Sequence, residues 1–190
     1  MNFPDVLPRI TAALERAGIA YMITGSFAGA YHGSLRSTQD IDLVIEATPP
    51  QLRALIESLP TGEYYAEVDA ALEALKRTSM FNIIDQRSGW KIDMIIRKNR
   101  AFSREEFRRR QPVTTQGLSF FVATAEDVIL AKLEWSKLAQ SQRQIADAAG
   151  ILKLRGESLD HSYLEKWISE LDLKTEWENA QRVAAGSGFE

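Results

Sequence analysis

The sequence has no cysteine, only two histidines and no long apolar run. Without cysteine the chain forms no disulfide and offers no thiolate to a metal, which is compatible with a cytoplasmic location. The two histidines, His32 and His161, lie outside any His/acid motif, so a histidine-rich metal site or a histidine-based triad is not expected. No stretch reaches about 18 apolar residues, so we expect no membrane span and no membrane partner. The first residues lack a basic segment followed by an apolar one, so we expect no secretory signal.

The composition is that of a globular protein with a substantial core. Hydrophobic residues make up 45% of the 190 residues and charged residues 26%, both ordinary values for a soluble domain. The net charge of −3 argues against a dedicated nucleic-acid binder, because such proteins are often basic overall.

The spacing of apolar residues divides the chain into a mixed first part and a helical second part. We expect an α+β core over residues 1–122, with a mixed sheet and helices packed on it, and a helical region over residues 123–190. The elements expected in the first part are helices at 4–17, 27–32, 49–60 and 67–77, strands at 21–24 and 41–45, a hairpin at 80–96, and two short strands within 112–122.

Two aspartates separated by one residue form the most informative pattern. Asp40 and Asp42 open an apolar strand, and residues two apart on a strand project to the same face, with Cα atoms roughly 6–7 Å apart. Two carboxylates on one face repel each other unless a cation lies between them, and oxygen ligands of this kind suit Mg²⁺. The alternative is an exposed Asp-x-Asp at the end of a strand.

A Gly-Ser pair lies upstream of these aspartates. Gly25 and Ser26 follow the strand at 21–24 and open a helix, a position where backbone N–H groups bind phosphate. Gly25 permits a close backbone approach, and Ser26 can cap the helix or donate to a phosphate oxygen. Arg36 and Thr38 precede the aspartates and add a cation and a hydroxyl beside the expected metal site.

A third carboxylate is expected at Asp93. It is the one acid in the apolar strand 90–96, where an ionised side chain needs a partner or a metal. The alternatives are that Asp93 ends its strand facing water, or that Asp85 takes this role. Asp85 lies at the turn end of its strand, where a solvated aspartate is unremarkable.

These residues together resemble the nucleotidyltransferase superfamily, which has the polymerase β-like fold. The segment RSTQDIDLVI is most similar to the AbiEii-type branch, whose toxin members belong to bacterial toxin–antitoxin and phage-defence systems. The resemblance implies transfer of an NMP from an NTP to a hydroxyl, with release of pyrophosphate. It also implies two Mg²⁺ ions, or Mn²⁺ in their place, held by Asp40 and Asp42 with help from Asp93, which is usually the general base. The turn at Gly25 and Ser26 would then hold the triphosphate.

The helical part carries weaker signals. Lys132 lies among apolar residues, where it is either a snorkelling surface lysine or a functional one. Arg143 and Asp147 are spaced i,i+4 and can form a simple helix ion pair. The AbiEii-like resemblance implies instead that Lys132 contacts NTP phosphates, that Arg143 and Asp147 are accessory site residues, and that the helical region packs on the active-site cleft.

A basic stretch bears on the acceptor. The segment 97–110 holds seven basic residues against two acids and directly follows the strand with Asp93, so it can hold the phosphates of an RNA acceptor. The alternative is a solvated helix face with Glu–Arg pairs. We expect an acceptor that is tRNA or a protein, and a cognate antitoxin as partner.

Three other functions compete with this prediction. The first is a nucleotidyltransferase that modifies a small molecule, as the aminoglycoside-modifying relatives do. The second is a catalytically silent binding protein, which would have no reason to keep mutually repelling carboxylates. The third is a metal phosphohydrolase, which the Gly-Ser turn and the scarcity of histidine fit less well.

Overall fold

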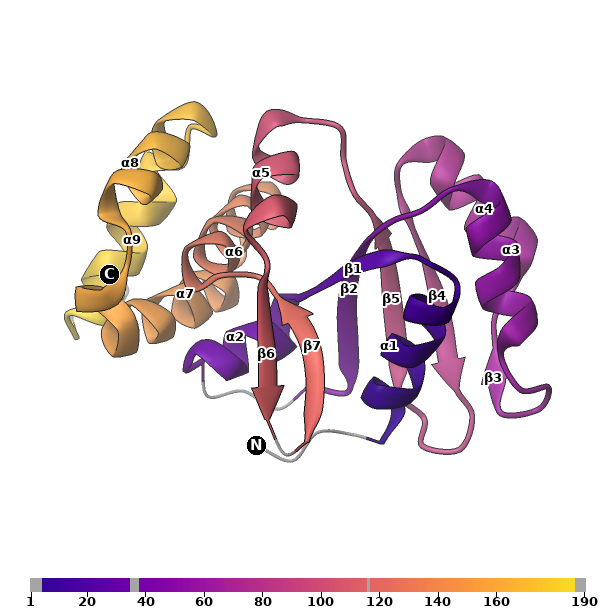
Figure 1. The fold of residues 1–190 in the computed structure, drawn as a ribbon. Helices are drawn as coiled ribbons and strands as arrows, with labels where there is room; N and C mark the ends of the chain where they lie inside the picture. The colour runs from indigo at the N-terminus through magenta and orange to yellow at the C-terminus, as the bar shows by residue number, and fades with distance from the viewer. Residues whose placement is uncertain (1–4, 35–37, 116, 187–190) are drawn as a thin grey trace. The chain divides into compact units, whose positions relative to one another are not determined.

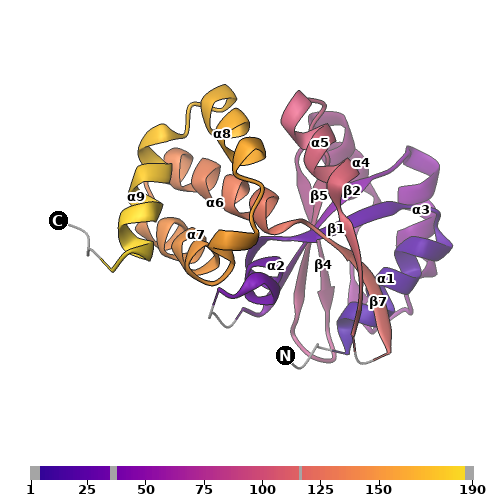
Figure 2. The ribbon, with the colours of Figure 1, turned by 60° about the vertical axis from the view of Figure 1, so that its left-hand side comes forward.

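A computed structural model describes residues 5–34, 38–115 and 117–186. The chain divides into two compact units, which are described separately (Figures 1 and 2). The sheet unit comprises Met1–Phe27 and Thr38–Val122, and the helical unit comprises Ala28–Ser37 and Ala123–Glu190. Residues 28–34 therefore group with the C-terminal helices, although they are far from them in sequence.

A mixed sheet forms the centre of the sheet unit. Among the described residues it has seven strands in the order β3-β4-β5-β2-β1-β7-β6. The pairs β2–β5 and β1–β7 are parallel and the other pairs are antiparallel. The strands are β1 (Ala20–Thr24), β2 (Asp40–Glu46), β3 (Tyr64–Tyr65), β4 (Met80–Asp85), β5 (Lys91–Ile96), β6 (Gln111–Thr115) and β7 (Leu118–Val122). This mixed sheet with its helices confirms the expected α+β fold.

The described helices that lie wholly within the sheet unit follow the sequence signals closely. They are α1 (Val6–Arg16), α3 (Pro49–Ser58), α4 (Val68–Arg77) and α5 (Ala101–Arg109). Helix α1 buries a stripe at i, i+4 and i+8, formed by Val6, Ile10 and Leu14. Helix α3 begins at a proline, and Thr48 and Gln51 form a capping box at its first turn.

The first residues of two central strands alternate between an apolar face and a face that carries the acids. In β2, Ile41 and Leu43 are fully buried and alternate with Asp40 and Asp42, which are exposed and half-buried respectively. Strand β5 repeats this alternation, because Ile92 and its i+2 and i+4 neighbours are buried on the same side. The period of two therefore drives the apolar side chains into the core and places the acids on the opposite face.

The helical unit is built by helices that bury apolar side chains against one another. Its elements are α6 (Ala125–Ala139), α7 (Gln142–Arg155), the 3₁₀ helix η1 (Gly156–Ser158), α8 (His161–Glu170) and α9 (Lys174–Ala184), together with most of α2 (Gly25–His32), which links the units along the chain. Thr124 caps α6 by accepting a hydrogen bond from the backbone N–H of Asp127. The Tyr163 hydroxyl donates to the Asp127 carboxylate at 2.6 Å and thereby ties α8 to α6. None of the described helices is long and apolar enough to cross a bilayer.

Some local features differ from the expectations. The short strand β3 was not predicted, and the turn position Gln116 lies outside the described residues. The expectation that Asp85 is solvated is wrong. Its side chain is fully buried and accepts a hydrogen bond from Arg9 Nη2 at 2.8 Å, with a second from the Ser88 hydroxyl. Desolvation by burial acts to raise the pKa of Asp85, but the hydrogen bonds and the Arg9 charge outweigh it and lower the pKa.

Candidate active site

Strand register brings the three predicted aspartates to one face of the sheet unit. In the parallel pair β2–β5, Asp42 lies opposite Asp93 and Asp40 lies opposite Lys91. Residues paired across neighbouring strands point to the same face, and the strands are about 4.8 Å apart. The register therefore gathers three carboxylates and one ammonium group on the face opposite the apolar core. We call these four side chains the carboxylate cluster.

Lys91 lies among the three acids. Its Nζ is 3.0 Å from Asp93 Oδ2 and 3.7 Å from Asp40 Oδ1. The hydrogen bond to Asp93 and the negative charges of Asp93, Asp40 and Asp42 raise the pKa of Lys91, while desolvation acts in the opposite direction. The ammonium therefore neutralises part of the negative charge that the strand register brings together.

Asp93 is held by two different donors. Lys91 binds Oδ2, and the side-chain amide of Asn82 donates to Oδ1. Asn82 is the cross-strand neighbour of Asp93 in the antiparallel pair β4–β5, which explains why the two side chains meet. The residue is only 7% exposed, and a buried carboxylate of this kind needs such partners.

Gly25 makes room for the carboxylate of Asp42. Its φ is +62°, and a Cβ added to it would lie 1.9 Å from Asp42 Oδ2. Any side chain here would clash with the carboxylate and would also strain the backbone. The Gly25–Ser26 turn, which was predicted to approach a phosphate, therefore lies directly against one of the predicted metal ligands. Ser26 is half-buried in the first turn of α2.

Thr38 fixes the start of β2. Its hydroxyl oxygen is 3.1 Å from the backbone N of Asp40 and 3.2 Å from the backbone O of the same residue. This local pattern orients the strand residue that carries the first carboxylate. Arg36, the other predicted nucleotide-binding residue of this segment, lies outside the described residues.

A family model described as a nucleotidyltransferase of unknown function (DUF6036) matches residues 7–185. The chain belongs to this nucleotidyltransferase family. A search of curated proteins finds no match.

Two solved structures that match this chain share its fold. The solution structure of the antibiotic-resistance factor ANT(2'')-Ia aligns with a TM-score of 0.54 at 15% identity, over 92% of this chain and 93% of that one. The crystal structure of an antigenic nucleotidyltransferase-like protein from Paracoccidioides brasiliensis aligns with a TM-score of 0.52 at 16% identity, over 92% of this chain and 91% of that one. At such identities the likeness shows the fold and nothing finer.

The donor set fits a hard divalent cation. In the described part of the chain, no group of three His, Cys, Asp or Glu side chains is already arranged to hold a metal ion. In the cluster, the Lys91 ammonium lies against two of the carboxylates that would be ligands. The oxygens of Asp40, Asp42 and Asp93 are nevertheless the ligand type that Mg²⁺ and Mn²⁺ prefer.

In the helical unit, Lys132 and Asp147 form a buried ion pair. Lys132 Nζ is 2.7 Å from Asp147 Oδ2 and 3.4 Å from Gln144 Oε1. The Lys132 side chain is only 4% exposed, so the alternative of a snorkelling surface lysine does not hold. Ser34 donates to the other carboxylate oxygen of Asp147 at 3.3 Å. Arg143, one turn before Asp147, is exposed.

The basic stretch contains helix α5 and several local pairs. Arg108 donates to Glu105 at 2.6 Å, as expected for a solvated helix face with Glu–Arg pairs. Arg97 donates to Glu46 at 2.7 Å, and the Arg110 guanidinium stacks over the Phe107 ring at 4.4 Å. Part of the positive charge is therefore already neutralised within the sheet unit.

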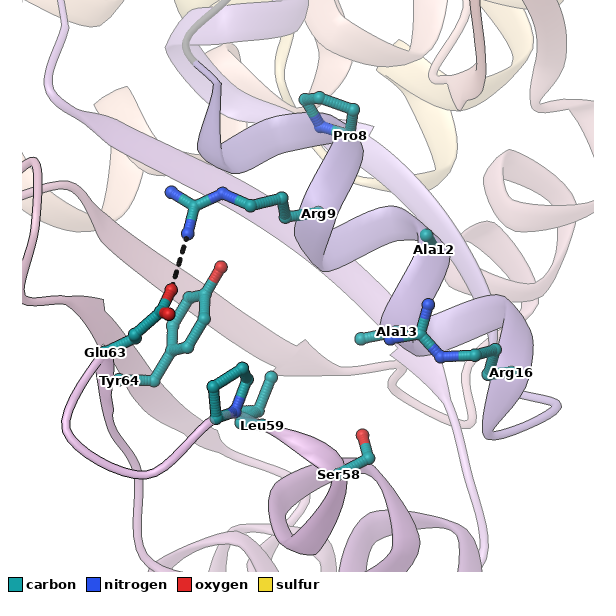
Figure 3. Close-up of a pocket in the computed structure, with 10 residues that line it drawn as sticks. Pro8, Arg9, Ala12, Ala13, Arg16, Ser58, Leu59, Glu63 and Tyr64 are labelled. Atoms are coloured by element: carbon teal, nitrogen blue, oxygen red, sulfur yellow. Dashed lines mark ion pairs between the residues drawn. The ribbon is translucent and has the colours of Figure 1, made fainter.

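A separate pocket of about 360 Å³ lies in the sheet unit between α1 and the segment after α3. Figure 3 shows its walls, which include Pro8, Ala12 and Leu59, and the ion pair between Arg9 and Glu63 at 3.5 Å. Its lining is mainly apolar and holds none of the clustered carboxylates, so it is not the candidate active site.

Sequence reasoning missed Lys91 and Asn82. Lys91 precedes Asp93 by two residues, just as Asp40 precedes Asp42. A parallel pairing of β2 with β5 therefore places Lys91 beside Asp40 when Asp93 is beside Asp42. Nothing in the sequence alone fixes that register, and Asn82 needs the antiparallel register of β4 as well.

Proposed function

We propose that the carboxylate cluster catalyses metal-dependent transfer of an NMP from an NTP to a hydroxyl group. The observation that supports this most strongly is the register that brings Asp40, Asp42 and Asp93 to one face of the sheet in a chain of a nucleotidyltransferase family. Nucleotidyltransferases generally use divalent ions, and three carboxylates suit two Mg²⁺ ions, with Mn²⁺ as a substitute.

The proposed reaction is an in-line displacement at phosphorus. The acceptor oxygen forms a bond to the α-phosphorus, the bond from the α-phosphorus to the bridging oxygen breaks, and pyrophosphate leaves. Bound divalent ions would stabilise the charge on the attacking and leaving oxygens. Asp40 and Asp42 would hold these ions, and Asp93 would accept the hydroxyl proton and complete the ligand set.

The surrounding residues would position the nucleotide. Gly25 lets the turn approach Asp42 closely, and the N-terminus of α2 presents backbone N–H groups suited to a phosphate. Ser26 would donate to the triphosphate, while Thr38 orients Asp40 through its backbone. The predictions that Arg36 and Lys132 contact phosphates, and that Arg143 and Asp147 are accessory site residues, remain proposals.

We favour a macromolecular acceptor, tRNA or a protein, and a toxin-like role of the AbiEii type with a cognate antitoxin. The arginines of segment 97–110 support an acceptor rich in phosphate, although some already pair within the unit. A small-molecule acceptor is the second candidate, because the antibiotic-resistance factor ANT(2'')-Ia has the same fold.

The test is a labelling experiment with each α-³²P-labelled NTP, Mg²⁺, and either total tRNA or a protein lysate. We expect label in one macromolecular pool from a preferred NTP, and its loss in Asp42→Asn, which removes the charge and keeps the shape. The matched control is Asp172→Asn, an exposed acid of the helical unit that pairs with Lys137, and it should label as the wild type does.

Three results would contradict the proposal in different ways. Intact NTP with no labelled product would argue against the macromolecular acceptor and favour a small molecule or a silent scaffold. Release of phosphate or NMP that depends on Asp42 would indicate hydrolysis. Equal labelling by Asp42→Asn would place the activity elsewhere.

A further inference from the structure

We infer that Lys91 is a resident counter-ion of Asp93 and Asp40 and lowers the affinity of the carboxylate cluster for divalent metal ions, so that an entering ion must displace the ammonium group. This inference rests on the proposed function, because it concerns the same three carboxylates. It assigns to Lys91 a role that the aspartate pattern alone does not contain.

The first support is geometric. Lys91 Nζ lies 3.0 Å from Asp93 Oδ2 and 3.7 Å from Asp40 Oδ1, so it already binds two of the carboxylates that a metal would need. A divalent ion cannot bind the same oxygens while the ammonium stays there, because the two positive charges repel strongly at such short distances.

The second support is that Lys91 can leave. Lys91 is the first residue of strand β5, and its side chain is 41% exposed. The ammonium can therefore move into water without disrupting the core. Lys132 in the helical unit is the contrasting case, because its side chain is 4% exposed and its pair is enclosed. The partial exposure of Lys91 is what an exchangeable counter-ion requires.

The third support is charge. The ammonium places a positive charge beside Asp93 and Asp40, so its removal would increase the attraction of these carboxylates for a divalent ion. The lysine therefore tunes the affinity of the cluster instead of closing it. It also prevents mutual repulsion of the acids from destabilising the sheet when no metal is bound.

The experiment is a Mn²⁺ titration of the full chain without nucleotide, in which the electron paramagnetic resonance signal of free Mn²⁺ reports binding. We expect Lys91→Met to lower the Kd about tenfold, which corresponds to about 1.4 kcal/mol. Lys91→Arg keeps the charge and should bind as the wild type does. Lys98→Met removes an equal charge at an exposed position of the same unit and should also leave binding unchanged.

Further variants separate this inference from the proposed function. Asp42→Asn should abolish the tight Mn²⁺ site, and Lys91→Gln replaces Lys91→Met if the latter does not fold. Unchanged or weaker binding in the charge-removing Lys91 variants, with binding that still depends on Asp42, would overturn the role of Lys91 and leave the metal site standing. Absence of Mn²⁺ binding in the wild type would overturn both.

Discussion

Each unit holds a lysine beside one or more carboxylates, and the two arrangements differ in the number of acids around the lysine and in its exposure. In the helical unit, Lys132 and Asp147 form a buried ion pair, and Gln144 and Ser34 provide further polar contacts. In the sheet unit, Lys91 lies half-exposed among three acids. An enclosed pair holds helices together, whereas an accessible group of three carboxylates is suited to an additional cation.

The largest effect is expected when the proposed base is neutralised. Asp93→Asn keeps the size of the side chain but removes its charge, so transfer should fall about 10²–10⁴-fold, the usual contribution of a general base. Initial rates at saturating NTP and Mg²⁺ measure this, with Asp172→Asn as the control. Wild-type rates in Asp93→Asn would remove Asp93 from the mechanism.

The buried pair should instead control stability. Asp147→Asn leaves the Lys132 charge buried without its counter-charge and should lower the free energy of unfolding by about 3–5 kcal/mol. Lys91→Met removes a half-exposed ammonium and leaves Asn82 bound to the buried Asp93 carboxylate, so the loss should be smaller, about 1 kcal/mol. Urea denaturation followed by circular dichroism compares the two variants. Equal decreases in the free energy of unfolding would contradict the proposed difference between the two lysines.

A third prediction concerns Gly25, where the structure offers a matched control. Gly25 and Gly62 both have positive φ, so alanine strains the backbone at either position. Only at Gly25 would the new Cβ meet Asp42, because nothing lies within 4 Å at Gly62. Gly25→Ala should therefore lower transfer about 10²-fold through displacement of the carboxylate. Similar activity of the two variants, once corrected for folded fraction, would contradict a role for this contact.

Most of the fold was predictable because its signals are local. Alternation with a period of two indicated β2 and β5, and the stripe of α1 and the prolines of α3 marked those helices. The short strand β3 was not predictable, since two residues carry no period. It forms because Tyr64 and Tyr65 can pair with the end of β4.

The site was predictable only where the chemistry lay in the sequence itself. An Asp-x-Asp pattern on a strand predicts that two carboxylates point to the same face. Asp93 was identified because it is the one acid in an apolar strand. The roles of Lys91, Asn82 and Asp85 depend on partners brought close by strand pairing or tertiary packing. The pairing of Lys132 with Asp147 could not be predicted in the same way, because the two residues lie 15 positions apart on successive helices.

The smallest expected effect is a pH dependence in the helical unit. Burial lowers the pKa of His32 from 6.5, although the hydrogen bond to the Ala123 carbonyl acts in the opposite direction. In the unfolded chain His32 has its ordinary pKa of about 6.5, so as the pH falls the unfolded chain binds a proton before the folded chain does. The free energy of unfolding therefore decreases as the pH falls from about 6.5 towards the lower pKa of the folded state. His32→Gln should lose less stability than the wild type between about pH 7 and pH 5. Parallel unfolding curves at each pH test this, and an identical pH slope in both proteins would refute it.

The most direct test of the central claim is to map the residues at which a divalent ion binds. Sub-stoichiometric Mn²⁺ added to the isotope-labelled full chain broadens the backbone amide signals of residues near the ion. We predict that the strongest broadening falls at Asp40, Asp42 and Asp93 and at their strand neighbours, and that it disappears in Asp42→Asn. Broadening centred on Asp147 or on scattered surface acids, or none at all, would contradict a metal-dependent active site in the sheet unit.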